Sequence, residues 1–384
     1  MTPSAPNSTP RPLSLIAELT HRCPLHCLYC SNPIQMQKAS EELTTGDWKR
    51  VFREAAALGV LQLNLTGGEP LVRKDLAELI ASGRRAGLYV NMITSGVGLN
   101  DERLAELVEA GLEHLQLSFQ DLDEASANYI AGTKAHVIKL ALAPRIRRFP
   151  LAFTVNLVVH RMNLDRLEQF IAMAEELSPD RLEIAHVQYY GWALKNRSLL
   201  MPTEKQVHRA LEIVAKAKER LRGKIQLESV FPDYFGSFPK ACVGGWGRQM
   251  MLIDPAGNAL PCHAAAVIAN LEFDNVRAHD LAWIWRESSA FQRFRGDAWM
   301  PDTCLKCPRK EIDFGGCRCQ AYLLTRDANA IDPVCRYSPS HGLLETLRST
   351  GAEPIPIWRM QSVPGDASGD KNQSPHSRVS RPAY

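Results

Sequence analysis

The sequence has almost no excess of charge of either sign. Its 384 residues include 45 lysines and arginines against 42 aspartates and glutamates, a formal net charge of +3. A chain so close to neutrality gives no electrostatic reason to bind nucleic acid or a membrane surface. It also lacks any apolar run near the roughly 20 residues that a membrane-spanning helix needs. We therefore expect neither nucleic acid nor a membrane among its partners.

The sequence also lacks a secretion signal. Residues 1–12 are polar and rich in proline, and no basic stretch leads into an apolar core. We therefore expect a cytoplasmic protein. In a reducing compartment, ten cysteines are better explained as metal ligands than as disulfides.

Three of these cysteines have the spacing C-x-x-x-C-x-x-C and follow a short apolar run, residues 13–19. Cys23, Cys27 and Cys30 could hold a four-iron cluster and leave one iron open to bind a small molecule and pass it an electron. Zinc is an alternative, although structural zinc normally takes four Cys or His ligands. His21 or His26 could supply the fourth. A disulfide is the weakest interpretation, since nothing marks the chain as secreted.

A second motif favours iron and sulfur. The apolar residues 63–65 lead into the turn Thr66-Gly67-Gly68-Glu69-Pro70. Together with the three cysteines and Tyr29 between the last two, this turn resembles the radical S-adenosylmethionine (SAM) enzymes. The resemblance implies a four-iron cluster whose open iron binds SAM. SAM is then cleaved to a 5′-deoxyadenosyl radical, which abstracts hydrogen from an unactivated carbon.

The resemblance also suggests which residues contact SAM. Glu69 stands where the family has a carboxylate that accepts a hydrogen bond from the SAM ammonium, and such charge-assisted bonds are short and orienting. Gly67 and Gly68 allow a close approach of the backbone. Tyr29 either contacts the adenine or packs. Further candidates are Asn156, within an expected strand, and, at the ends of expected strands, Ser118, Gln120, Asp121, His186 and Gln188.

Strand-like and helix-like segments alternate along the first part of the chain. Six strands are expected, at 13–19, 61–65, 88–93, 114–119, 153–159 and 182–188. Apolar spacing predicts a helix from Trp48 to Leu58, capped by Thr44 or Thr45 and ended by Gly59. Two more helices begin at Asp75 and Asn100. Six β-α repeats indicate a parallel sheet covered by helices, too few for an eight-stranded barrel. The expected fold class is α/β, a partial (β/α)6 barrel of the radical SAM type.

Ligands of parallel α/β folds bind at the carboxyl ends of the strands, where the candidate residues should converge. We predict a disordered N-terminus at 1–12, the partial barrel at 13–222, an auxiliary iron–sulfur domain at 223–350 and a disordered tail at 351–384. Within the second domain, residues 250–253 and 259–260 predict a hairpin around a turn at 254–258.

The other seven cysteines lie in this second domain. Cys242, Gly257 and Cys262 match the start of the SPASM pattern, an auxiliary-cluster extension of some radical SAM enzymes. Cys304 and Cys307 supply its C-x-x-C. Asp313 stands in the place of the fifth cysteine, Cys317 and Cys335 take the last two places, and Cys319 is extra.

The resemblance implies two auxiliary clusters. We name the near set as Cys242, Cys262, Cys317 and Cys319, and the far set as Cys304, Cys307, Cys335 and Asp313. A carboxylate is a harder ligand than a thiolate, but it can bind iron. The tight Cys317-x-Cys319 pair favours a two-iron near cluster beside a four-iron far cluster. The alternative is a pair of structural zinc sites.

The segment 188–197, which contains Tyr189, Tyr190 and Trp192, resembles the peptide cyclase family of pyrroloquinoline quinone biosynthesis. Asp313 and Cys319 fit that family too. The resemblance spans roughly residues 13–347 and implies joining a glutamate side-chain carbon to a tyrosine ring in the precursor peptide PqqA. An auxiliary cluster would then accept one electron from the ring. The three aromatic side chains either wall the peptide cleft or pack.

Only about a dozen residues precede the first expected strand, so a leader-binding domain is not expected in this chain. The expected partners are the PqqA peptide, a separate peptide chaperone, PqqD, and an electron donor such as flavodoxin. One alternative is another SPASM maturase, of the sulfatase-maturing, thioether-forming or decarboxylating type. A non-catalytic zinc-ribbon protein is an alternative of a different class.

Overall fold

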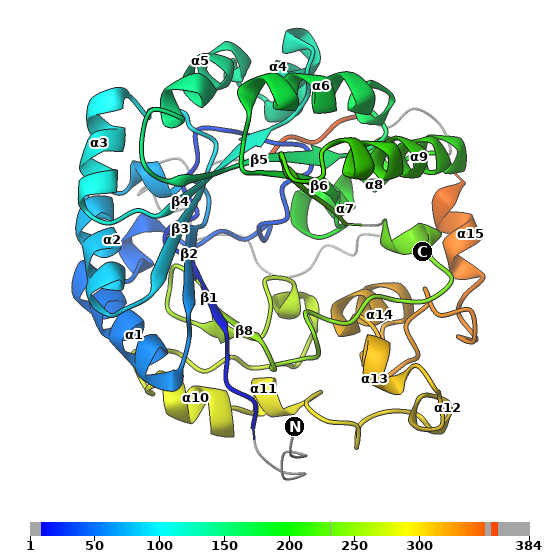
Figure 1. Ribbon diagram of the computed structural model, residues 1–384. Helices are drawn as coiled ribbons and strands as arrows, with labels where there is room; N and C mark the ends of the chain where they lie inside the picture. The colour runs from blue at the N-terminus through cyan, green and yellow to red at the C-terminus, as the bar shows by residue number, and fades with distance from the viewer. Residues whose placement is uncertain (1–8, 231, 350–354, 360–384) are drawn as a thin grey trace, which may run out of the picture.

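The computed structural model describes residues 9–230, 232–349 and 355–359 (Figure 1). Its centre is one nine-stranded sheet in the order β7-β6-β5-β4-β3-β2-β1-β8-β9. All neighbouring strands are parallel except the β8–β9 pair. The strands are β1 (Ser14–Glu18), β2 (Gln62–Thr66), β3 (Tyr89–Thr94), β4 (His114–Phe119), β5 (Ala152–Val159), β6 (Arg181–His186), β7 (Gln226–Val230), β8 (Met250–Ile253) and β9 (Ala259–Leu260).

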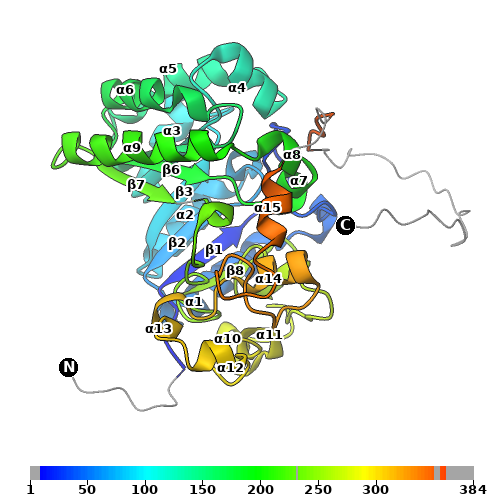
Figure 2. The same cartoon turned by 90° about the vertical axis from the view of Figure 1, so that its right-hand side faces the viewer.

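Helices cover the outer face of the curved sheet (Figure 1). The larger ones are α1 (Thr45–Leu58), α2 (Leu76–Arg85), α3 (Asp101–Glu109), α4 (Glu124–Ala131), α5 (His136–Ile146), α6 (Leu167–Leu177) and α9 (Glu204–Arg220). Short helices α7 (Gly191–Lys195) and α8 (Arg197–Leu200) follow β6. The later part of the chain lies beside β8 (Figure 2) and contains α10 (Leu281–Glu287), α11 (Ser289–Gln292), α12 (Asp302–Leu305), α13 (Lys310–Asp313), α14 (Arg318–Thr325) and α15 (Leu343–Arg348).

The predicted helix caps are confirmed. The Thr44 side chain accepts a hydrogen bond from the Asp47 amide at the start of α1, and Gly59 ends the helix with φ of 99°. Asn100 caps α3 in the same way, through the Arg103 amide. Each cap pairs backbone groups that a helix end would otherwise leave without partners.

The two faces of the sheet differ in chemistry. Leu15, Leu63 and Val90 are fully buried in the main apolar core. On the inner face, the Asn64 amide donates to Ser14 Oγ at 2.8 Å, and the Asn91 amide donates to Asn64 Oδ1 at 2.9 Å. Side chains alternate along a strand, so one face builds the core while the other gives the barrel a polar interior.

The sheet extends beyond the six strands that the sequence predicts. β7 adds to β6, and β8 pairs in parallel with β1, with Ser14 opposite Met250. The 250–260 hairpin is confirmed, but its pairing with β1 is not visible in the sequence. Parallel pairing joins segments far apart in the chain and leaves no local signal. Within the described residues, no helix has both the length and the apolar character needed to cross a membrane.

The predicted disorder of both ends needs correction where the structure describes them. The Trp285 indole donates to the Pro10 carbonyl at 2.7 Å, which places residues 9–12 against α10. Residues 355–359 are also placed, and Arg359 is only 2% exposed. Their polar composition suggested a free tail, yet their polar groups are hydrogen-bonded to the folded chain. The remainder of 1–12 and 351–384 lies outside the described residues.

Candidate active site

A cavity of about 500 Å³ opens at the carboxyl ends of the strands. Most of the predicted site residues line it, although they come from separate loops and strand ends. They are Cys23, Cys27, Tyr29, Cys30, Gly67, Gly68, Ser118, Gln120, His186 and Gln188. The expected convergence on one mouth of the barrel is therefore confirmed for these ten.

The three cysteines of the first motif share this cavity without a disulfide. Burial raises the pKa of Cys23 to about 11 and that of Cys27 to about 12. Burial also raises the pKa of Cys30. Metal ligation requires the thiolate, so binding iron here must release protons that the empty site retains at neutral pH. Three thiols that face one cavity fit a cluster with one iron left open.

The two histidines considered as a fourth zinc ligand have other contacts. His26 Nδ1 lies 2.6 Å from the Arg359 carbonyl oxygen. His21 Nδ1 accepts a hydrogen bond from the Gln37 amide at 2.9 Å. Neither histidine is among the residues that line the cavity.

The glycine turn packs directly against the cysteine loop. A Cβ on Gly67 would lie 2.3 Å from the Thr20 carbonyl oxygen, and one on Gly68 would lie 2.3 Å from that of Arg22. The Gly68 amide donates to Thr20 O at 2.5 Å, and the Glu69 amide donates to Arg22 O at 2.8 Å. Only glycine permits this approach, so the turn positions the cysteine loop as well as the cavity wall.

Glu69 is buried behind the glycine turn. Its carboxylate is 1% exposed and is absent from the cavity lining. It accepts hydrogen bonds from the Thr94 hydroxyl at 2.7 Å, the Ser95 amide at 2.7 Å and the Leu71 amide at 3.1 Å. Burial still raises the pKa of this carboxyl. Glu69 thus fixes the end of β3 to the glycine turn, and its contact with the SAM ammonium stays a prediction.

Asn156 and Asp121 also lie off the cavity lining. Asn156 hydrogen-bonds the Glu183 carboxyl inside the barrel. Asp121 accepts a hydrogen bond from Arg166 Nε at 2.8 Å and another from Ser126 Oγ at 2.5 Å. These partners come from several separate elements, so no local sequence pattern predicts them.

Sequence reasoning missed a buried lysine behind the cavity. Lys139 of α5 is fully buried and donates to Gln120 Oε1 at 2.5 Å and to the Ser118 carbonyl at 3.0 Å. Gln120 in turn donates to the Tyr29 hydroxyl at 2.9 Å. Burial lowers the pKa of Lys139 to about 8. The available signal was a lone lysine in the apolar run 137–143.

The near set of auxiliary cysteines is brought together. Cys262 Sγ and Cys319 Sγ lie 3.8 Å apart. Cys242 lies within hydrogen-bonding reach of Cys262 and Cys317, and Cys319 within reach of Cys317. The Tyr190 hydroxyl lies 3.3 Å from Cys317 Sγ. Four thiols from three separate segments thus share one small buried volume.

The far set is looser. Cys304, Cys335 and Asp313 are close enough to influence one another electrostatically. Asp313 Oδ2 accepts from Arg309 Nε at 3.2 Å, and Oδ1 accepts from the Gly315 amide at 3.1 Å. Among the described residues, no three His, Cys, Asp or Glu side chains are spaced to hold a single metal ion. Ligands of a cluster bind different iron atoms and need no common centre.

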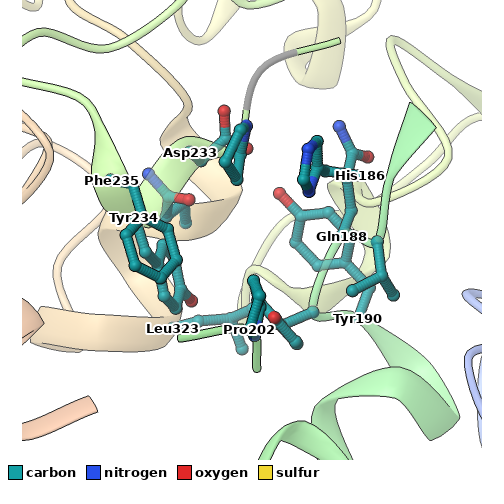
Figure 3. Close-up of a pocket in the computed structure, with 12 residues that line it drawn as sticks. His186, Gln188, Tyr190, Pro202, Asp233, Tyr234, Phe235 and Leu323 are labelled. Atoms are coloured by element: carbon teal, nitrogen blue, oxygen red, sulfur yellow. The ribbon is translucent and has the colours of Figure 1, made fainter. Parts of the chain in front are cut away.

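A smaller pocket shares lining residues with the large cavity and with the cavity beside the near set (Figure 3). His186 and Gln188 line both this pocket and the large cavity, and Gln188, Tyr190 and Asp233 also line the cavity beside Cys242 and Cys317. Figure 3 shows His186, Gln188 and Tyr190 across the pocket from Asp233 and Tyr234. The pocket thus adjoins both cavities.

The aromatic segment after β6 is tied to the first cysteine loop. The Trp192 and Ala193 amides both donate to the Cys30 carbonyl, at 3.0 and 3.1 Å. Tyr190 reaches the near set, whereas Tyr189 packs on Tyr234 with ring centroids 5.2 Å apart. Both tyrosines line the small pocket, and packing describes part of the run. A role in walling the peptide cleft stays a prediction.

Two protein-family models match this chain. A model of the radical SAM superfamily matches residues 17–174, and a model of the SPASM iron–sulfur cluster-binding domain matches residues 242–308. A Bradyrhizobium diazoefficiens protein named PqqA peptide cyclase is 52% identical over 332 residues, which are 86% of this chain and 87% of that protein. The chain belongs to the PqqA peptide cyclase family.

Other members of the PqqA peptide cyclase family are similar to this chain over most of its length. The Methylobacterium nodulans protein is 49% identical over 93% of this chain and 95% of its own length. Among solved structures, Streptococcus suis SuiB bound to S-adenosylmethionine has a TM-score of 0.70 at 19% identity, over 85% of this chain and 77% of SuiB. The protein anSMEcpe with bound AdoMet has a TM-score of 0.60 at 14% identity, over 88% of this chain and 96% of its own. These structures support the radical SAM fold.

Proposed function

We propose that this chain is a radical SAM peptide cyclase that acts on a PqqA precursor peptide, an early step of pyrroloquinoline quinone biosynthesis. The observation that carries the proposal is the identity of about half with proteins named PqqA peptide cyclase, over most of both chains. The cavity adds independent support, because Cys23, Cys27 and Cys30 face the same space as the glycine turn.

The three thiolates would hold the SAM-cleaving cluster. When bound, the cluster and SAM supply a 5′-deoxyadenosyl radical able to take hydrogen from carbon. Gly67 and Gly68 line the same cavity, and Ser118, Gln120 and Tyr29, which also line it, would orient the cofactor there.

Peptide cyclisation would take place between the large cavity and the near set. Joining a glutamate side-chain carbon to a tyrosine ring leaves one electron and one proton to be removed from the ring. The near set lies next to the pocket of His186, Gln188 and Tyr190, where the ring would sit. Once it holds iron, the near set is the candidate acceptor of this electron. The far set of Cys304, Cys307, Cys335 and Asp313 would extend the electron-transfer path outward.

The remaining partners follow from the same assignment. PqqD would present the peptide, and a flavodoxin-like protein would supply the electron for SAM cleavage. The cytoplasm is the compartment in which both the thiols and these partners would be available. A two-iron near cluster and a four-iron far cluster complete the proposed cofactor set.

An anaerobic assay with reductant, SAM, PqqA peptide and PqqD tests the function. We expect a peptide lighter by two hydrogens together with 5′-deoxyadenosine, both detected by mass spectrometry. The variant Cys27→Ser should abolish both products, since it removes a ligand of the SAM-cleaving cluster. Deoxyadenosine with an unchanged peptide, under more than one reductant, would move the substrate to another SPASM pathway.

A further inference from the structure

Residues 355–359 return from the second domain to the loop of Cys23, Cys27 and Cys30. The Arg359 amide donates to the His26 carbonyl at 3.1 Å, and the Arg359 carbonyl oxygen lies 2.6 Å from His26 Nδ1. Two residues back, Asn196 bonds both backbone groups of Ile357, at 2.7 and 2.8 Å. The segment is thus held on two sides, by the cysteine loop and by the helices after β6.

This anchoring places the Arg359 side chain in the wall of the large cavity. Its guanidinium donates to the carbonyl oxygens of Leu25, at 3.3 Å, and His21. Its buried Nε has no hydrogen-bond partner. Among the residues that the structure describes, no carboxylate lies within 4.0 Å of it. Within the described part of the chain, Arg359 is therefore a buried cation without a carboxylate partner.

Such an arrangement is costly unless a bound group completes it, because removing a charge from water needs compensation. The buried Arg73 shows the usual solution in this protein, with Asp75 at 2.7 Å and Glu42 at 3.6 Å. Arg359 instead faces three cysteines, whose thiolates carry negative charge once they bind iron.

A second buried arginine repeats the pattern at the auxiliary cysteines. Arg318 is 1% exposed, donates to the main-chain carbonyls of Ala328 and Ala330, and also has an unpartnered Nε. Its charge acts on Cys304 of the far set. Among the described residues, neither guanidinium has a carboxylate within 4.0 Å, although the Arg318 charge also acts on the buried Asp332. Both guanidiniums lie beside cysteines assigned to iron.

We propose that Arg359, carried back by the segment 355–359, is the counter-charge of the cluster held by Cys23, Cys27 and Cys30, and thereby makes this cluster easier to reduce. The inference rests on the proposed cluster site. Arg359 acts as a positioning and tuning residue, not as a ligand. A positive charge nearby stabilises the more negative, reduced state, so its loss makes electron uptake less favourable.

The test is an EPR-monitored redox titration of the reconstituted protein, in which the SAM-site cluster and the auxiliary clusters are followed separately. In Arg359→Gln we expect the equilibrium constant for reduction of the SAM-site cluster to fall about tenfold, which is about 59 mV for one electron. The potentials of the auxiliary clusters should not move. In Arg359→Lys the potential of the SAM-site cluster should stay close to that of the unaltered protein, because lysine keeps the positive charge.

A matched control is Arg277→Gln. Arg277 also donates to main-chain carbonyls, those of Ala256, Glu41 and Glu42, but it is exposed and does not line the cavity. An unchanged potential in Arg359→Gln overturns the inference. If Arg359→Gln instead binds SAM more weakly in equilibrium dialysis and its potential is unchanged, the inference is also overturned. In that case the Arg359 charge would be assigned to the SAM carboxylate.

Two further outcomes remain distinguishable. If Arg359→Gln fails to hold the SAM-site cluster by iron and sulfide analysis, cluster retention in Arg359→Lys still supports a role for charge. Cluster loss in Arg359→Lys as well overturns it in favour of a steric role. If the unaltered protein forms no EPR-active cluster at Cys23, Cys27 and Cys30, the proposed function fails, and the inference fails with it.

Discussion

His160 provides a quantitative test of how the barrel supports its site. The residue follows β5, is fully buried, and its ring lies 5.7 Å from that of Tyr29 in the cavity wall. Nδ1 accepts from the Met162 amide at 3.3 Å, while the buried Nε2 has no partner. Burial lowers the pKa of His160 to about 3. The folded protein therefore keeps the imidazole neutral at pH values where an unfolded histidine is protonated.

The sign and size of the effect follow from proton linkage. An ordinary histidine has a pKa of about 6.5. Between pH 6.5 and pH 3 this side chain therefore binds a proton in the unfolded chain but not in the folded protein. Stability is retained above pH 6.5 and lost as the pH falls through this window. At pH 5.5 about nine in ten unfolded imidazoles are protonated, which costs the folded state about 1.4 kcal/mol relative to pH 8.

The variant His160→Leu removes this titration and keeps an apolar side chain of similar size. Its loss of unfolding free energy from pH 8 to pH 5.5 should be about 1.4 kcal/mol smaller than in the unaltered protein. Anaerobic urea unfolding at both pH values, followed by circular dichroism, measures the difference, in which the other titrating groups cancel. His208→Gln, at an exposed position of α9, is the control. Equal pH dependence in His160→Leu and the unaltered protein would refute the reasoning.

Three other predictions concern the cysteine sites. Asp313→Ala should change the EPR spectrum of the far cluster, whereas Asp297→Ala, which removes an exposed partner of Lys310, should not; an unchanged spectrum in Asp313→Ala would show that Asp313 is no ligand. Gly68→Ala puts a Cβ 2.3 Å from a backbone oxygen and should reduce iron content and SAM affinity at least tenfold. Its control is Gly46→Ala, whose Cβ would lie 3.6 Å from the nearest atom and which should leave both quantities unchanged. Tyr190→Phe should shift the potential of the near cluster alone, and Tyr189→Phe, whose hydroxyl contacts Met201 instead, should shift none.

Local patterns carried most of the correct predictions. The caps of α1 and α3 need only residues within one helical turn, so they can be read from short windows. The strand ends could be aligned because the β-α alternation fixes the direction of each strand. The three cysteines of the first motif and the two glycines of the second therefore came together in one cavity, as expected.

The sequence could not show side-chain partners that come from distant elements. Thr94 and Ser95 at the end of β3 hydrogen-bond Glu69, and no short stretch of sequence brings these residues together. Lys139 was not among the candidate residues, and Arg359 lay in the tail predicted to be disordered. Their burial depends on the packing of α5 and of residues 355–359, and nothing within a short sequence window specifies either.

The pairing of β8 with β1 has a consequence for folding and for the design of fragments. β1 comes first in the chain but lies inside the sheet, between β2 and β8. A fragment that ends before residue 250 would leave one edge of β1 without backbone partners, and an exposed edge of apolar sequence invites aggregation. Synthesis must also reach β8 before the sheet can be completed, and such distant pairing slows folding. The radical SAM and auxiliary regions are therefore two sequence domains but one cooperative folding unit, best expressed and studied together.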